Sequence, residues 1–133
     1  MDLKPYLHAV YVDGGRGNGQ YDCWGLVRAV LHEQFDTPLY RSFGSVEPHN
    51  KTLLTASAQK IMKQFSVQDE PMAGAVACGY IGKRMVHIGV CVEADGMLKV
   101  LHAHIKGIRL NTLRDFAKVS GSRVEYHVPK QLL

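Results

Sequence analysis

The sequence predicts an α+β domain in which N-terminal helices pack against a small antiparallel sheet. Its first half carries apolar residues at spacings of three and four, which indicate amphipathic helices. From Gly74 onward, apolar and polar residues alternate as they do in half-buried strands. Ala94-Asp95-Gly96 has the composition of a tight turn between two such strands. Helices followed by neighbouring strands favour a segregated arrangement of the two.

Two helices separated by a glycine-rich segment are expected first. The opening helix runs from about Leu3 to Tyr11, and the four glycines of residues 13–20 predict an irregular loop. The next helix begins after Asp22, which is a good N-cap, and Thr37-Pro38 ends it. The apolar stripe of this helix consists of Trp24, Val27, Leu31 and Phe35.

The rest of the chain is expected to form one more amphipathic helix and then the sheet. A loop over Arg41–Asn50 leads into a second amphipathic helix with the apolar residues Leu54, Ala58, Ile61, Met62 and Phe65. Four strands are predicted, over residues 75–81, 85–93, 97–105 and 123–128. A short helix is expected over residues 111–119, between the last two strands.

Size and composition limit the class of protein. The 133 residues contain no repeat or linker, which predicts a single domain over residues 1–133. The longest apolar run has nine residues, against about 20 for a spanning helix, and no signal peptide is recognisable, so we expect cytoplasmic synthesis and no membrane insertion. A net charge of +4 without a basic run does not favour nucleic-acid binding. Three cysteines without Cys-x-x-Cys spacing fit free thiols.

Cys23 is the first candidate for chemistry. It follows the N-cap Asp22, so its sulfur lies at a helix N-terminus, where the free N–H groups favour an anion. Thiolate is the nucleophilic form of cysteine, so this position suits a catalyst. Packing as a small apolar residue is an equally good interpretation of this residue taken alone.

His87 lies in a strand whose alternation suggests a role outside the core. Val86, Ile88, Val90 and Val92 share one face, which is expected to be buried, and His87, Gly89 and Cys91 share the other. Gly89 would leave room beside His87 for another group or for a substrate. A merely exposed or locally bonded histidine remains the alternative. On the next strand, His102 and His104 share a face, and either can become a neighbour of His87 if the register allows.

Ordered blocks along the chain resemble the NlpC-type peptidases, papain-like cysteine hydrolases that cut bacterial cell-wall peptides. The blocks are Tyr11–Gly15, Tyr21–Val27, His87–Val90 and His102-Ala103, and they span nearly the whole chain. The resemblance implies a compact papain-like (NlpC-type) fold, with the cysteine-bearing helix packed on a small antiparallel sheet.

The resemblance also implies roles for individual residues. Cys23 corresponds to the nucleophile, His87 to the general base and acid, and His102 to the residue that orients His87. The candidates for substrate contact are Tyr11, Asp22, Trp24 and His104. Trp24 is also the simplest anchor of its helix to the core, and His104 is more a neighbour of the site than a catalytic member.

The implied function is hydrolysis of a peptidoglycan stem-peptide amide, between D-glutamate and a diamino acid, by a Cys-His-His mechanism without a cofactor. Trp24 replaces the serine that is common after the nucleophile, and no acidic residue follows Gly74. The Cys23–Val27 segment is similar to a branch found in phage and prophage tails. The expected partners are therefore stem peptides and phage tail proteins, and the expected destination is the virion tail.

Two other functions remain open. The same fold could serve as a non-catalytic tail-assembly module. Alternatively, His87, His102 and His104, with Cys23, could bind zinc, since imidazole and thiolate are normal zinc ligands. Cys78 and Cys91 lie in apolar strands and are expected to be buried packing residues.

Overall fold

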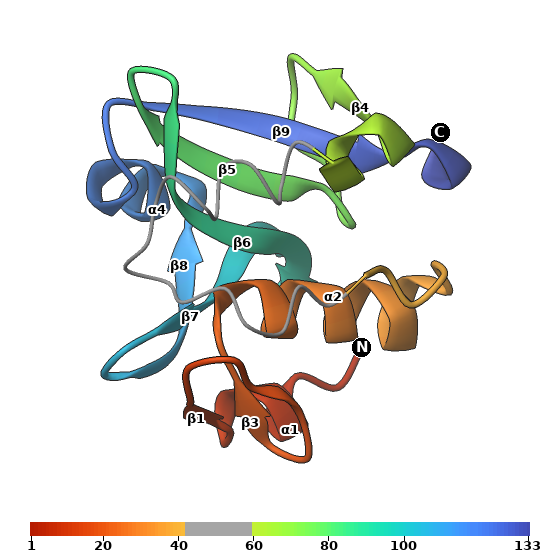
Figure 1. The fold of residues 1–133 in the computed structure, drawn as a ribbon, viewed down its shortest axis with the longest axis vertical. Coiled ribbons are helices and arrows are strands. Elements are labelled where there is room, and N and C mark those ends of the chain that lie inside the picture. The colour runs from red at the N-terminus through yellow and green to blue at the C-terminus, as the bar shows by residue number, and fades with distance from the viewer. Residues whose placement is uncertain (42–59) are drawn as a thin grey trace.

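A six-stranded antiparallel sheet forms the centre of the computed structural model, which describes residues 1–41 and 60–133 (Figure 1). Its strands are β4 (Phe65–Gln68), β5 (Val76–Ile81), β6 (Arg84–Ala94), β7 (Met97–His104), β8 (Gly107–Thr112) and β9 (Arg123–Pro129). Their order across the sheet is β4-β9-β5-β6-β7-β8. Short 3₁₀ turns, η1 (Met62–Gln64) and η2 (Lys130–Leu132), precede β4 and follow β9. The predicted α+β class and antiparallel sheet are confirmed.

The N-terminal segment differs from the helix expected from about Leu3 to Tyr11. α1 covers only Lys4–Leu7, and three two-residue strands follow: β1 (Val10–Tyr11), β2 (Arg16–Gly17) and β3 (Gln20–Tyr21). β3 pairs with β1 in parallel and with β2 in antiparallel orientation. The glycine-rich segment therefore forms a small paired sheet rather than an irregular loop. The pairing gives hydrogen-bond partners to backbone N–H and C=O groups that would bind water in a loop.

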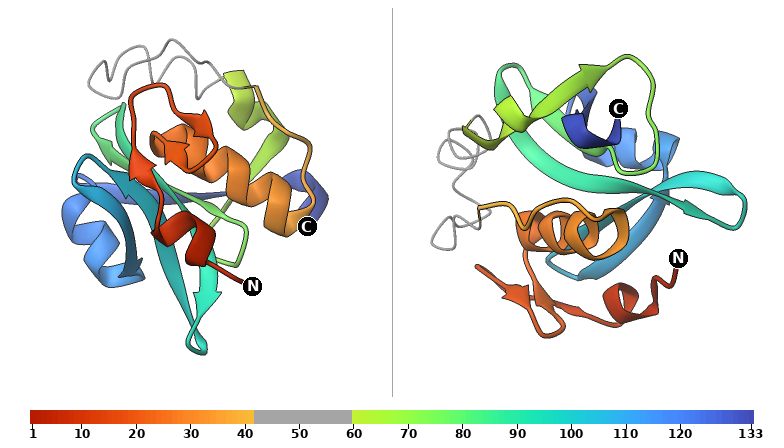
Figure 2. Two further views of the ribbon diagram at one scale, coloured as in Figure 1. Left: turned by 90° about the horizontal axis from the view of Figure 1, so that it is seen from below. Right: turned by 90° about the vertical axis from the view of Figure 1, so that its right-hand side faces the viewer.

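The helix predicted after Asp22 is present as α2 (Cys23–Phe35). It ends at Asp36, which adopts the left-handed conformation with φ 57°. α2 lies along β6 and β7 (Figures 1 and 2). Its buried residues, with Leu26, Val27, Val30 and Leu31 almost fully enclosed, form the main core with Ile88, Val90 and Leu101 of these strands.

The second face of the sheet is also buried, which corrects the expectation that His87 points away from apolar surroundings. Cys91 and Val100 alternate with the main-core residues and pack in a second cluster around Phe116. Phe116 belongs to α4 (Leu113–Val119), on the side of the sheet opposite α2. Phe116 thus covers one side of the His87 ring, and His87 itself stays half-buried.

β6 contains a bulge beside the predicted site residues. Gly79 pairs with His87 and Tyr80 pairs with Met85, so Val86 is an extra residue on β6. Simple alternation puts Met85 on the same face as His87, but Met85 is 2% exposed and belongs to the core cluster under α2. The bulge therefore changes the face on which the residues before His87 lie.

Two expected helical segments are wrong in part. Asn111 and Thr112 end strand β8, and only residues 113–119 are helical. Phe65 begins β4 instead of closing a helix. Most of the predicted helix from Leu54 lies outside the described residues, as does the expected loop after Arg41. Within the described residues, no helix combines the length and apolar character that a membrane crossing requires.

Candidate active site

Cys23 is the first residue of α2, as the sequence predicted, and is 4% exposed. A helix of 13 residues directs its unpaired backbone N–H groups and the positive end of its dipole toward this position. Because α2 packs on β6 and β7, Cys23 starts a helix that rests on the two strands carrying His87 and His102.

Asp22 holds the start of α2 through three donors. Its Oδ1 accepts from the Gly25 backbone N–H at 2.7 Å, and its Oδ2 accepts from that of Gly14 at 3.1 Å. Arg16 adds an ion pair at 2.5 Å. The Asp22 side chain is 3% exposed. The structure thus gives this predicted substrate-contact residue a structural role that joins the glycine-rich segment to the helix.

Gly25 permits that junction to be tight. A Cβ at this position would lie 2.0 Å from the carbonyl oxygen of Gly15, closer than any side chain tolerates. The backbone of the glycine-rich segment therefore rests directly on the first turn of α2.

Tyr11 lies beside the N-terminus of α2. In the parallel ladder it pairs with Tyr21, which immediately precedes the Asp22-Cys23 pair. Burial raises the pKa of Tyr11, and the negative charges of Cys23 and Asp13 add to this effect. Tyr11 therefore keeps its phenolic hydrogen, and the effect of the Cys23 charge on it shows that the two side chains are close.

His87 and His102 are neighbours through their imidazole rings. The β6–β7 ladder runs from Ala94↔Met97 to Val90↔Leu101, which brings Gly89 opposite His102 at its end. Nε2 of His87 lies 2.7 Å from Nδ1 of His102. A Cβ on Gly89 would lie 3.0 Å from the Cβ of His102. The space beside Gly89 is thus occupied by His102 rather than left for a substrate.

Two residues that the sequence analysis missed complete the histidine pair. Asn111 Oδ1 forms a short contact with Nε2 of His102. The Phe116 ring stacks on His87 with centroids 5.7 Å apart and meets His102 edge-on at 5.1 Å. The alternation of residues 107–112 was the available signal for β8, and it would have placed Asn111 on the same face as its partners.

His102 is held in its neutral form. It is 1% exposed, and burial lowers its pKa, an effect to which the charges of His104 and Arg109 contribute, while the hydrogen bond to Asn111 opposes it. A neutral imidazole has one donor and one acceptor nitrogen. His102 is therefore suited to orient His87 without competing for its proton.

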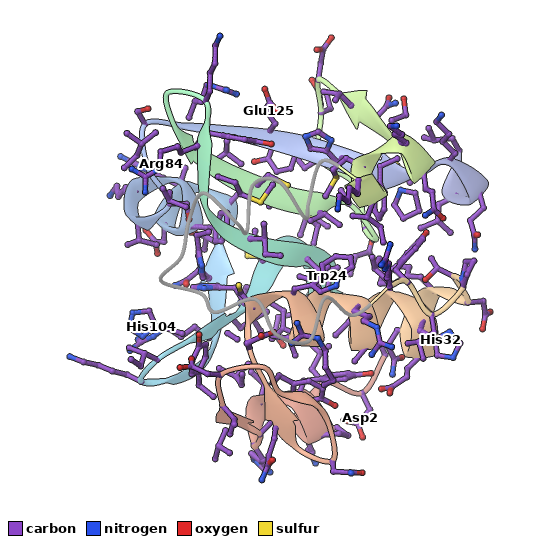
Figure 3. The ribbon with its side chains drawn as sticks, in the orientation of Figure 1. Asp2, Trp24, His32, Arg84, His104 and Glu125 are labelled. Atoms are coloured by element: carbon purple, nitrogen blue, oxygen red, sulfur yellow. The ribbon has the colours of Figure 1, made fainter. Side chains whose placement is uncertain are left out.

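Trp24 and His104, the remaining predicted contact residues, lie differently. The Trp24 ring is 6% exposed, packs 6.5 Å from the ring of Tyr40 and donates from Nε1 to the Arg41 carbonyl at 2.8 Å. It therefore anchors the helix (Figure 3). Nδ1 of His104 accepts from the Lys106 backbone N–H at 3.1 Å in the β7–β8 turn. The structure gives Trp24 a packing role and His104 a local bond next to the site.

The ring nitrogens also bear on the zinc hypothesis. Both nitrogens of His102 are engaged, one with His87 and one with Asn111, and Nδ1 of His104 serves the turn. In residues 1–41 and 60–133, no group of three or more His, Cys, Asp or Glu side chains is arranged to hold a metal ion. This part of the chain thus offers zinc no ligand set.

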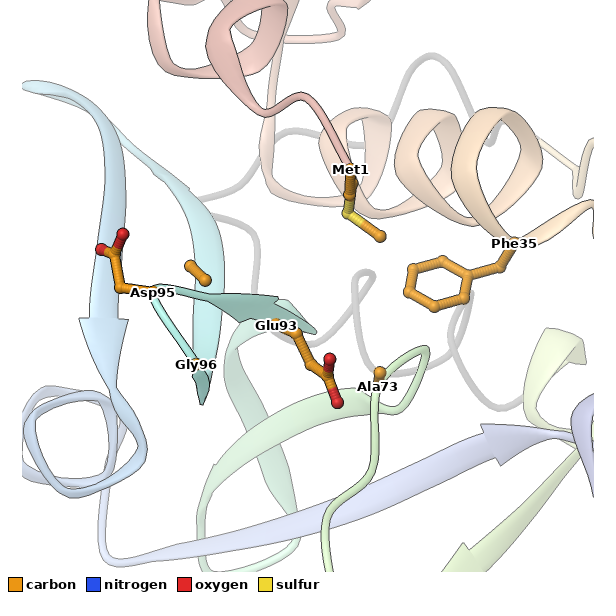
Figure 4. Close-up of a pocket in the computed structure, with 7 residues that line it drawn as sticks. Met1, Phe35, Ala73, Glu93, Asp95 and Gly96 are labelled. Atoms are coloured by element: carbon orange, nitrogen blue, oxygen red, sulfur yellow. The ribbon is translucent and has the colours of Figure 1, made fainter.

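A surface hollow lies far from these residues. It has a volume of about 500 Å³ and is lined by Met1, Phe35, Ala73, Glu93, Ala94, Asp95 and Gly96 (Figure 4). Phe35 is the last residue of α2 and Cys23 the first, so a rise of 1.5 Å per residue separates them by roughly 18 Å. The hollow is therefore not the site of the predicted chemistry.

Cys78 and Cys91 are packing residues, as expected. Both are fully buried, and burial raises the pKa of each thiol, to about 12 for Cys91. Neither can supply a thiolate near neutral pH.

Two of three comparisons with known proteins found a match. The chain is similar in structure to the NlpC/p60 domain of the peptidoglycan hydrolase SagA, with a TM-score of 0.58 and 15% identity over 92% of this chain and 88% of that one. No curated protein matches the sequence. The profile of the NlpC/P60 family matches residues 8–124, which include most of the chain and all the predicted site residues. The chain therefore belongs to the NlpC/P60 family.

Proposed function

We propose that this protein is a cysteine peptidase that hydrolyses an amide bond in peptidoglycan stem peptides. Cys23 is the nucleophile, His87 the general base and acid, and His102 the residue that orients His87. The observation that carries the proposal is the His87–His102 contact of 2.7 Å on the strands against which the Cys23 helix packs. Family membership and the likeness to a peptidoglycan hydrolase domain support it.

The reaction proceeds through an acyl-enzyme. The Cys23 thiolate attacks the carbonyl carbon, forming a C–S bond, and the backbone N–H of Cys23 donates to the developing oxyanion. As the C–N bond breaks, His87 gives its proton to the leaving amine. It then takes a proton from water, whose oxygen attacks the thioester and releases the acid. Cys23 and His87 return to their starting protonation states.

The N-terminus of α2 and the histidine pair have different roles in the reaction. The dipole of α2 favours negative charge on Cys23. His102 is buried and uncharged, so it can accept the N–H of His87 both before and after His87 becomes protonated. Such an arrangement supplies nucleophile, base and orienting group from this chain alone.

Mass spectrometry of muropeptides tests the activity. The reduced protein is incubated with purified muropeptides beside Cys23→Ala and, as a matched loss of a thiol elsewhere, Cys91→Ala. We expect cleavage by the parent and by Cys91→Ala, and none by Cys23→Ala with an unchanged circular-dichroism spectrum. Appreciable cleavage by Cys23→Ala would contradict the assignment of the nucleophile.

The finer specificity is part of the same proposal. The bond joins D-glutamate to a diamino acid, and the masses of the two products identify it directly. Carboxylates next to that bond suit a chain with a net charge of +4. Products cut at another amide would keep the peptidase assignment and reject this bond.

We further propose that the domain acts in a phage or prophage tail, a proposal that rests on the Cys23–Val27 segment. Complementation with Cys23→Ala separates this role from catalysis. Full particle assembly with lost infection supports a tail-borne enzyme. Full assembly and full infection would favour the alternative of a non-catalytic assembly module.

A further inference from the structure

Asn111, His102 and His87 are joined by side-chain contacts in that order. Asn111 lies on β8, where it pairs with Val100, two positions along the ladder from the pair His102↔Arg109 and therefore on the same face of the sheet. Its Oδ1 contacts Nε2 of His102, and Nδ1 of His102 lies 2.7 Å from Nε2 of His87. A side chain on a paired strand is held more rigidly than one on a loop, so this contact is suited to a positioning role.

The direction of each hydrogen bond follows from the amide oxygen. An amide oxygen can only accept, so the hydrogen in the contact with Asn111 belongs to Nε2 of His102. Neutral His102 then has no hydrogen on Nδ1, which must accept. The hydrogen of the 2.7 Å contact therefore comes from Nε2 of His87. This leaves Nδ1 of His87 as the basic nitrogen of the pair.

We propose that Asn111 is a positioning residue that holds His102 in its Nε2–H tautomer and thereby leaves Nδ1 of His87 to exchange the proton of Cys23. The inference rests on the proposed function only in assigning that proton transfer to His87. The tautomer is a property of the resting protein and does not depend on the substrate.

The opposite tautomer would block the same chemistry. With a hydrogen on Nδ1, His102 would require Nε2 of His87 to accept, so neutral His87 would carry its hydrogen on Nδ1 and could take no proton there. Protonated His87 has hydrogens on both nitrogens. Its Nε2–H would then face the Nδ1–H of His102, and two donors cannot form a hydrogen bond. Only the Nε2–H form of His102 accepts from His87 in both protonation states.

The surroundings leave His102 little choice of another partner. His102 is 1% exposed, and Phe116, itself fully buried, covers both rings. Loss of the Asn111 oxygen would leave a buried N–H without its acceptor, which favours a move of the hydrogen to the other nitrogen. Groups that orient a metal-bound imidazole typically change metal affinity or activity by about 10–100-fold when removed, and we expect the same range for the imidazole of His102.

Nitrogen-15 NMR of the histidine rings tests the tautomer without any substrate. In the parent protein at neutral pH, we expect His102 to be protonated at Nε2 and unprotonated at Nδ1. In Asn111→Leu, which is similar in size and has no acceptor, we expect this pattern to be lost. If His102 of the parent protein carries its hydrogen on Nδ1, the inference is overturned. This measurement uses the parent protein alone, so it stands even if Asn111→Leu does not fold.

Kinetics of the same variants give a second readout. We expect Asn111→Leu to lower kcat by about 10–100-fold with KM within about twofold, while Lys118→Leu, an exposed change on α4, leaves both unchanged. Unchanged kcat in a folded Asn111→Leu would overturn the positioning role. If the parent cleaves no muropeptide, the proposed function fails, and the NMR result still decides the tautomer.

Asn111→Asp separates positioning from packing. Its carboxylate restores the acceptor but favours a charged His102, whose Nδ1 then carries a hydrogen and cannot accept from His87. In the described part of the chain, His102 also interacts with the titratable or charged groups of His87, His104 and Arg109. We expect the acid limb of the kcat profile to move to higher pH, with activity recovering where His102 is neutral. An unmoved acid limb would overturn the inference.

Discussion

Replacing Asp22 by alanine should destabilise the protein strongly, because one carboxylate serves three donors. The Gly25 N–H loses its cap, which costs about 1 kcal/mol. The Gly14 N–H loses a charged acceptor, worth about 1.5–3 kcal/mol. Arg16, whose side chain is 15% exposed, loses its ion-pair partner. These losses overlap, so we expect about 3–5 kcal/mol in total, the range for breaking a largely buried pair.

Urea unfolding followed by fluorescence measures this loss, with two variants for comparison. Asp22→Asn keeps an equally good cap and should lose about 1–3 kcal/mol, mainly from the ion pair. Asp69→Ala makes the same substitution at an exposed carboxylate and should stay within about 0.5 kcal/mol. A loss below about 1 kcal/mol in Asp22→Ala would refute the view that Asp22 ties the glycine-rich segment to α2.

Three further outcomes are expected. Gly89→Ala should push the added methyl against His102, whose Cβ lies 3.0 Å away, lowering stability by about 1–3 kcal/mol in thermal unfolding and lowering kcat in muropeptide assays. Burial lowers the pKa of His102, so the unfolded state binds the proton more readily, and the free energy of unfolding should fall as pH drops below about 6.5. In His102→Gln, Tm should depend less on pH over the same range. Iodoacetamide should alkylate Cys23 in the folded protein and reach Cys78 and Cys91 only after unfolding, as peptide mapping will show.

Each of these has a contradicting result. Gly74→Ala, whose Cβ would lie 2.7 Å from Cδ1 of Leu132, is a crowded control away from the histidines. If the two variants lose the same kcat for the same loss of stability, a specific effect on His102 is rejected. A parent Tm that does not change between pH 7 and 5 would reject the His102 linkage. Alkylation of the strand cysteines at the rate of Cys23 would contradict their burial.

Amphipathic patterns explain why much of the fold could be predicted. α2 and the long strands bury one or both faces, and burial leaves a regular pattern of apolar residues. The Asp95-Gly96 turn was predictable because both residues adopt positive φ, 54° and 79°, for which their types are suited. The match to the NlpC/P60 family confirms the resemblance that the ordered sequence blocks indicate.

The missed features depend on pairing between distant segments. β1 and β3 have two residues each, too few for a periodic signal, and exist because they pair with each other. β8 is only half buried, so its alternation is weak. The bulge at Val86 changes which face carries the residues before His87, and nothing in the local sequence marks it. Because the alternation of β8 is weak, the sequence predicts Asn111 to lie in a helix, and its contact with His102 is missed.

The position of β9 has a consequence for how the chain can fold. β9 pairs with β5 on one side and β4 on the other, so it lies inside the sheet although it follows the other five strands in the sequence. A ribosome-bound chain lacking residues 123–133 would expose two unpaired strand edges, which are prone to join other chains. Sheet closure must therefore wait until residues 123–129 have been made, and proteolytic loss of this strand would separate β4 from the rest of the sheet.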